Sequence, residues 1–126
     1  MNIWGVLTTA TALVLAFSGV TQAATLFSPP LLPSSSSTLS CELANLSTRD
    51  RTAEIQVLDL DGNVVGGSGG TITLAAGTTT AFATGAASNP VRCKFIVEGG
   101  KDDFRASVCV FQFSPPVGCT AAVEAR

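Results

Sequence analysis

Val-Arg-Cys-Lys-Phe-Ile-Val-Glu, residues 91–98, is the clearest strand signal in the chain. Apolar residues at 91, 93, 95 and 97 alternate with charged residues at 92, 94 and 98, and only Ile96 interrupts the polar face. A period of two places alternate side chains on opposite faces of a strand. The stretch therefore predicts a half-buried β-strand with Cys93 on its buried face.

Similar short apolar runs, broken by turn residues, occur on both sides of this stretch. They predict strands near residues 39–43, 53–57, 64–65, 72–74, 78–83, 104–113 and 119–125. Asp61-Gly62 predicts a hairpin with a type I′ turn, which needs positive φ at both central residues. The apolar parity shifts at Leu58-Asp59-Leu60, which predicts a bulge or a strand buried on both faces.

These runs decide the fold class. After the N-terminal segment, no stretch of about ten residues keeps helical periodicity without a Gly or Pro interruption. About seven or eight short strands predict an all-β fold, a small antiparallel β-sandwich of immunoglobulin-like type. A small β-barrel is the alternative. The only tryptophan is Trp4, so no tryptophan core marker supports a true antibody-type domain.

The four cysteines, Cys41, Cys93, Cys109 and Cys119, allow three disulfide connectivities. If the last two strands pair around Ser114, Cys109 lies directly opposite Cys119. We favour that bond together with Cys41–Cys93, which would join two strands by their apolar faces. The long Cys41–Cys93 loop would contribute roughly 4 kcal/mol and the short one roughly 2–3 kcal/mol.

A second connectivity stays open at this stage. If residues 91–98 pair with residues 104–111 around Lys101, Cys93 lies opposite Cys109, and Cys41 is left to bond Cys119. Metal binding is the competing use of four thiols. The chain has no C-x-x-C pair and no histidine, so we expect no zinc site, no other metal site and no redox-active pair.

The N-terminal part of the chain is uncharged, and Glu42 is the first charged residue. Residues 1–23 predict a signal peptide, with an apolar helix followed by small residues. Cleavage is expected after Ala23 or, as second choice, after Ala24. A retained transmembrane anchor is the alternative, since a span needs about 20 apolar residues. Cleavage would leave no stable membrane anchor.

Residues 24–37 follow as a Pro- and Ser-rich arm or linker, and residues 38–126 as a disulfide-stapled domain. The arm is expected to be disordered or to lie along an edge of the domain. Its apolar residues, Leu26, Phe27, Leu31 and Leu32, indicate that part of it lies on the domain. The signal and the cysteines together predict a secreted or periplasmic protein.

Composition narrows the function classes. The net charge of -2 argues against nucleic acid as a partner, because nucleic acid rewards basic patches. The absence of histidine removes the commonest general base near neutral pH. We expect no catalytic residues, no cofactor and no enzyme activity.

Three local motifs have competing interpretations. Asp59–Asn63 resembles a calcium loop but lacks a downstream bidentate Glu, so a hairpin turn is expected. Asn45-Leu46-Ser47 fits the N-glycosylation pattern, which chance also produces often. Arg105 interrupts an apolar strand and is expected to pair with Glu98 or Glu124 across a sheet.

Lys101, Asp102 and Asp103 form the densest charge cluster, at a predicted hairpin tip. A solvated turn is the simplest interpretation, and a loop that docks an unknown protein partner is the functional one. The leading hypothesis is a secreted or periplasmic, non-enzymatic module for protein binding, adhesion or structure. The alternatives are an assembly subunit that works by strand addition, through the Leu26–Leu32 arm or an exposed edge, and a secreted protease inhibitor.

Overall fold

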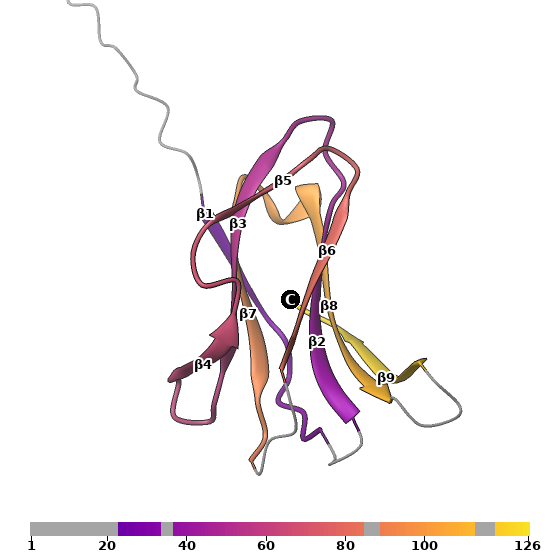
Figure 1. The fold of residues 1–126 in the computed structure, drawn as a ribbon. Helices are drawn as coiled ribbons and strands as arrows, with labels where there is room; N and C mark the ends of the chain where they lie inside the picture. Colours follow the sequence, from indigo (N-terminus) through magenta and orange to yellow (C-terminus); the bar gives the residue numbers. More distant parts are fainter. Residues whose placement is uncertain (1–22, 34–36, 85–88, 113–117) are drawn as a thin grey trace, which may run out of the picture.

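The computed structural model describes residues 23–33, 37–84, 89–112 and 118–126. These residues form two antiparallel β-sheets that pack face to face (Figure 1). The expected all-β sandwich is confirmed, and the sheets stay separate instead of closing into a barrel. The predicted signal-peptide helix falls at residues 1–22, which lie outside the described residues.

The first sheet runs in the order β1, β7, β3, with β4 and β5 both on the far side of β3. Its strands are β1 (Ala23–Phe27), β3 (Arg51–Leu58), β4 (Val64–Gly67), β5 (Ile72–Leu74) and β7 (Arg92–Glu98). The second sheet runs β6, β2, β8, β9. Its strands are β2 (Ser37–Asn45), β6 (Thr79–Thr84), β8 (Phe104–Gln112) and β9 (Gly118–Glu124).

The core lies between the inner faces of these sheets and follows the period-two patterns. Cys93, Phe95 and Val97 of β7 are buried, and the residues between them are half-buried. Leu39, Cys41 and Leu43 of β2 face them from the second sheet with no exposed surface. Burial of these alternating side chains is the main stabilising term of such a sandwich.

Both favoured disulfides are present. Cys41–Cys93 joins β2 to β7 across the core, with 5.8 Å between the Cα atoms. Cys109–Cys119 joins the neighbouring strands β8 and β9, with 5.7 Å between the Cα atoms. The pairing was right but its register was wrong, because Cys109 lies opposite Ala122 and a bulge after Val110 brings Cys119 opposite Phe111.

The expected hairpin between residues 91–98 and 104–111 is also wrong. β7 and β8 belong to different sheets, so Cys93 is not opposite Cys109. The connection forms a one-turn 3-10 helix, Lys101–Asp103, after Gly99 with a φ of 102°. This turn carries the chain across the core to the other sheet. Lys101, Asp102 and Asp103 therefore lie on an arch between the sheets.

The arm is largely part of the domain. Residues 23–27 form β1, which pairs along its whole length with β7, and Leu31 bridges to Val91. Leu26 is 4% exposed within the core. The folded domain thus begins before Thr38, and β1 is a strand additional to the eight that the sequence predicted.

The strand order also differs from that of an antibody domain. There the last strand lies beside the strand that carries the second cysteine. Here β1 lies beside β7, which carries Cys93, and the late strand β8 lies beside β2.

The Asp61-Gly62 hairpin forms between β3 and β4, but its turn is not of type I′. Only Gly62 has a positive φ, of 85°, and Asp61 does not. Asp59 accounts for the difference. Its carboxylate accepts hydrogen bonds from the N–H groups of Asp61 (2.9 Å) and Asn63 (2.8 Å), which favours a longer loop. The parity shift corresponds to a bulge between Val57 and Leu58.

Candidate functional site

The charged arch is the first candidate that the sequence singled out. Asp103 is fixed to the framework: its Oδ2 lies 3.3 Å from Arg51 Nη2, and its carbonyl accepts from Leu46 N–H at 2.8 Å. Arg51 belongs to the first sheet, and Leu46 follows β2 of the second. Asp103 therefore ties the two sheets together at this end. Lys101 and Asp102 are exposed.

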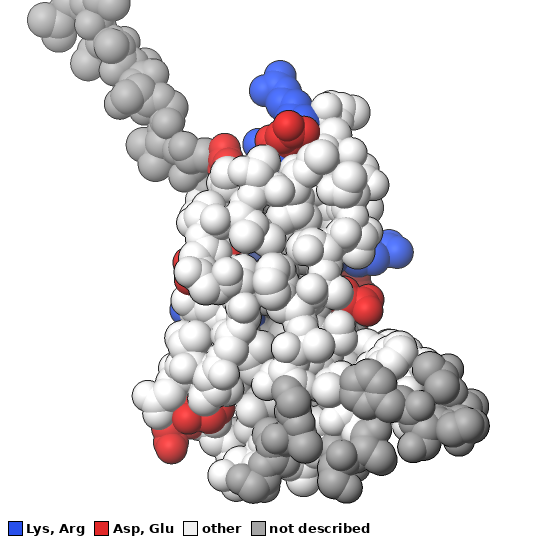
Figure 2. All heavy atoms as spheres, in the orientation of Figure 1, with Lys and Arg blue, Asp and Glu red and all other residues white. Residues whose placement is uncertain are grey.

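The loop after β2 lies beside this arch and is organised by one buried side chain. Asn45 has no exposed surface; its Nδ2 donates to the carbonyls of Arg49 (2.8 Å) and Leu74 (3.1 Å). Its Oδ1 accepts from Ser47. The amide nitrogen is inaccessible in the folded domain, so the Asn45-Leu46-Ser47 pattern acts there as a structural loop motif. Charges of both signs gather at this upper end of the molecule (Figure 2).

Glu98 lies close to Arg51 and has a perturbed carboxylate. Its Oε2 accepts from the Thr52 hydroxyl at 2.6 Å and from the Thr52 N–H at 3.2 Å. These hydrogen bonds, with a smaller contribution from the Arg51 charge, hold the pKa of Glu98 below its ordinary value. Glu98 is thus committed to β3 of its own sheet and cannot pair with Arg105 of the other sheet.

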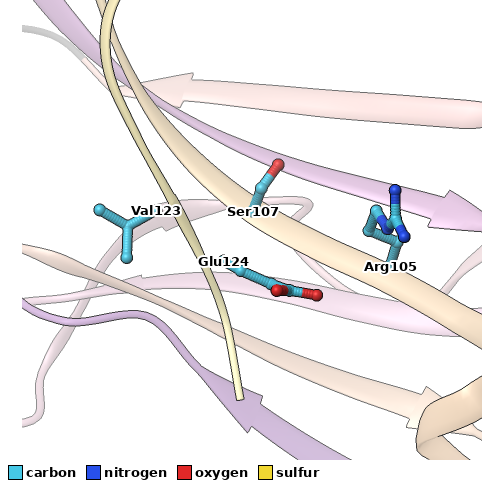
Figure 3. A pocket seen from close by; sticks show the side chains of 4 residues that line it. All are labelled: Arg105, Ser107, Val123 and Glu124. Carbon is cyan, nitrogen blue, oxygen red and sulfur yellow. The ribbon is translucent and has the colours of Figure 1, made fainter.

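A second candidate is a shallow hollow of about 340 Å³ lined by Arg105, Ser107, Val123 and Glu124 of β8 and β9. Figure 3 shows the Glu124 carboxylate and the Arg105 side chain on the same side of the strands, with Val123 directed away. Ser107 lies opposite Glu124 in the register. Within the described ranges, Arg51–Asp103 is the one ion pair, so the expected Arg105–Glu124 pair is not formed.

The chemistry of this hollow is limited. A serine nucleophile needs an adjacent base, and the chain has no histidine to supply one. In the described part of the chain, no group of three or more Cys, Asp or Glu side chains could hold a metal ion. The Asp59 carboxylate is likewise occupied by its own turn: the Asn63 backbone N–H is the main cause that lowers its pKa. The hollow is best described as a polar surface depression.

A third candidate is a part of the surface that has no charged residues. Residues 62–91 contain no Asp, Glu, Lys or Arg, and they include β4, β5 and β6. These strands form the far side of the sandwich from β1 and β9. Figure 2 shows a broad visible face without charge, with charged side chains at its rim. Leu60, Val64 and Val65 at the β3–β4 hairpin are each more than half exposed. We call β4, β5 and β6 the uncharged side.

The opposite side is bridged by the end of the chain. The C-terminal Arg126 exchanges backbone hydrogen bonds with Phe27 of β1, at 2.9 and 3.0 Å, and Ala125 N–H donates to Ala106 of β8 at 2.9 Å. The chain end thus bridges the two sheets. A smaller hollow of about 220 Å³ lies there, lined in part by Leu26, Phe104 and Ala125. Of the strands that end the two sheets, β4, β5 and β6 lie on the uncharged side, and β1 and β9 lie on this bridged side.

Sequence reasoning found the arch but missed the uncharged side. The signal was present as a 30-residue run without charge. It was not recognised because only the sheet order shows that β4, β5 and β6 come together along one side.

The part of the chain that the structure describes contains no helix that could span a lipid bilayer.

Comparison with known proteins supports the fold. A solved structure, Thermotoga maritima 1070, superposes with a TM-score of 0.56 over 81% of this chain and 91% of that chain, at 9% sequence identity. Similarity at this identity shows the fold alone. No protein-family model and no curated protein matches the chain.

Proposed function

We propose that the chain is an extracytoplasmic, non-enzymatic β-sandwich module that binds another protein through its uncharged side. One observation carries the proposal: the uncharged surface includes β4 and β6, which are end strands with free edges. Natural sheets usually protect edges with charge or proline, because unpaired N–H and C=O groups attract other strands. An edge without such protection fits strand addition as the binding mode.

Location outside the cytoplasm is the second part of the proposal. The two disulfides indicate an oxidising compartment. The uncharged apolar N-terminal segment with its Ala23-Ala24 exit supplies the export signal. Cleavage there would leave β1 nearly whole, since β1 begins at Ala23. N-terminal sequencing of protein secreted by the source cells should therefore read from Ala24 or Thr25; an intact Met1 would overturn cleavage.

Site-directed photo-crosslinking in the source cells tests the binding surface. A photoreactive residue at Ala81 of β6 is expected to give a discrete protein adduct, because Ala81 is exposed on the free edge. The same residue at exposed Asp102 tests the arch, and at exposed Arg105 it serves as the control. An adduct at Asp102 alone would show that the arch is the binding surface. If none of the three positions gave an adduct, the proposal of a protein-binding module would be wrong.

The inhibitor hypothesis gains little from the geometry of the arch. Residues Lys101–Asp103 form a helical turn, and Asp103 is held by Arg51. The arm is also not free to act as a donor in this structure, since β1 already adds to its own sheet. Strand addition through an exposed edge is the alternative that the uncharged side favours.

A further inference from the structure

β6 is a free edge whose outward backbone groups can be assigned. It pairs with β2 and ends the second sheet. The Asn45 N–H donates to the Thr78 carbonyl at 2.9 Å, which makes 45/78 a hydrogen-bonded pair. Such pairs recur every second residue of an antiparallel ladder, so they continue at Thr80, Phe82 and Thr84. The N–H and C=O groups of Thr79, Ala81 and Ala83 therefore point away from β2.

The side chains near these groups do not obstruct an incoming strand. Thr79, Ala81 and Ala83 are exposed and small, whereas Thr80, Phe82 and Thr84 are half-buried toward the core. The β2–β6 register has no bulge, and β6 has no charge and no proline. The other edge strands are less regular: Arg126 pairs with β1 at Phe27, bulges interrupt the pairing of β9 with β8 and of β4 with β3, and β5 has only 3 residues.

The sequence of β6 identifies the partner strand. Thr80-Ala81-Phe82-Ala83-Thr84 reads the same in both directions. Any antiparallel strand can pair with its own copy around a two-fold axis, as a closed dimer interface requires, and this sequence then places like residues opposite each other. We propose that β6 pairs with β6 of a second copy of this chain, with the axis at Phe82, so that the two four-stranded sheets become one.

The register of this pair follows from symmetry. Phe82 meets Phe82 of the second copy, Ala81 meets Ala83, and Thr80 meets Thr84. Ala81 and Ala83 both have outward N–H and C=O groups, so they form the hydrogen-bonded pairs, and Phe82 forms the closer, non-hydrogen-bonded pair. Aromatic pairs and Thr–Thr pairs across strands are favourable. Glu42, the charged residue opposite Ala81 on β2, is one strand away from the contact.

This inference rests on the proposed use of the uncharged side. The first test is the mass in solution of the mature protein, by sedimentation equilibrium over a range of concentrations. The native chain is expected to form dimers. Ala81→Lys should raise the dissociation constant at least about tenfold, since it places like charges beside each other in the pair. Thr73→Lys, at an exposed position on β5, is the matched control and should leave it unchanged.

Cysteine trapping tests the register without depending on a charged variant. Phe82→Cys should form a dimer-linking disulfide under mild oxidation, because the axis brings the two positions within bonding range. Ala81→Cys should not link to itself. Linking through Ala81→Cys alone would overturn the Phe82 axis, and a wild-type protein that stays monomeric would overturn self-pairing.

The two proposals fail in different ways. If the wild-type protein is monomeric but the Ala81 photo-crosslinker captures a different protein, self-pairing is wrong and the binding module stands. If the wild-type protein is monomeric and no position is crosslinked, both are wrong. Thermal unfolding of each variant confirms that a lost dimer does not reflect a lost fold.

Discussion

Asn45 is the side chain that connects the loops at the arch end. Its amide satisfies carbonyls from two other segments while it has no contact with solvent. A buried polar group of this kind is stabilising only while its hydrogen bonds are made. Burial of Asn45 also explains why a glycosylation pattern in the sequence has a structural use.

Replacement of this amide should be costly. Asn45→Ala is expected to lower the free energy of unfolding by about 2–3 kcal/mol, because the carbonyls of Arg49 and Leu74 lose their donor. Urea denaturation measures the change. Asn89→Ala, at an exposed position, is the control and should have little effect. Equal stability of the two variants would contradict the role assigned to Asn45.

Glu98 gives the fold a dependence on pH. Because its pKa is lower in the folded state than the ordinary value of 4.5, the ionised form stabilises the fold. That contribution is fully present above the ordinary value and is lost as the pH falls through the lowered pKa. Thr52→Val removes the hydroxyl donor and should raise the pKa of Glu98 toward its ordinary value.

NMR titration of the Glu98 carboxyl carbon measures this shift. Thr79→Val, at an exposed position on β6 of the other sheet, serves as the control and should leave the pKa unchanged. An unshifted Glu98 pKa in Thr52→Val would show that the backbone N–H of Thr52 is sufficient by itself.

At the level of elements, β1 shows how an apparent linker becomes part of the sheet. Ser28 exchanges hydrogen bonds with Cys93: its N–H donates to the Cys93 carbonyl at 2.9 Å, and its Oγ accepts from the Cys93 N–H at 2.8 Å. Phe27 lies beneath Arg92 and Lys94, 5.0 and 5.8 Å from its ring centre. These contacts attach the arm to β7. Removal of residues 24–37 would therefore expose an edge of the core.

The two leucines of the arm provide a direct test of this docking. Leu26→Ala should reduce the free energy of unfolding by about 2–4 kcal/mol, because Leu26 is 4% exposed in the core. Leu32→Ala should be nearly neutral, because Leu32 is 57% exposed. Chemical denaturation of both variants measures the difference. A neutral Leu26→Ala would indicate that the arm is detached in solution.

For the whole molecule, the two disulfides differ in accessibility. Cys41 and Cys93 have no exposed surface, while Cys119 is exposed at the start of β9. Cys41–Cys93 spans 52 residues of sequence and Cys109–Cys119 spans 10. The loop model gives roughly 4 and 3 kcal/mol for these spans. The inter-sheet bond is thus the more stabilising and the better protected.

Mild reduction of the native protein should therefore open Cys109–Cys119 first. Alkylation followed by peptide mapping is expected to find label at Cys109 and Cys119 while Cys41 and Cys93 stay bonded. Reduction after unfolding in urea is the control and should label all four. Early label at Cys93 would contradict the burial of the inter-sheet bond.

The sequence by itself determined the fold class and most of the strands, and it favoured the disulfide pairing that the structure shows. This was possible because the signal is local: the alternation of apolar and polar residues along a strand, as from Cys93 to Val97, indicates which side chains are buried. Asp61-Gly62 marked a hairpin for the same local reason, although the carboxylate of Asp59 altered its turn type.

Only the tertiary structure decided which strands lie side by side. Whether β8 returns beside β7 or crosses to β2 depends on contacts between residues far apart in sequence, and the period-two pattern is the same in both cases. The same holds for β1. Its Pro-rich surroundings indicated a linker, and only the tertiary structure shows that it pairs with β7. The uncharged strands β4, β5 and β6 came to lie along one side of the molecule only through the packing of the two sheets.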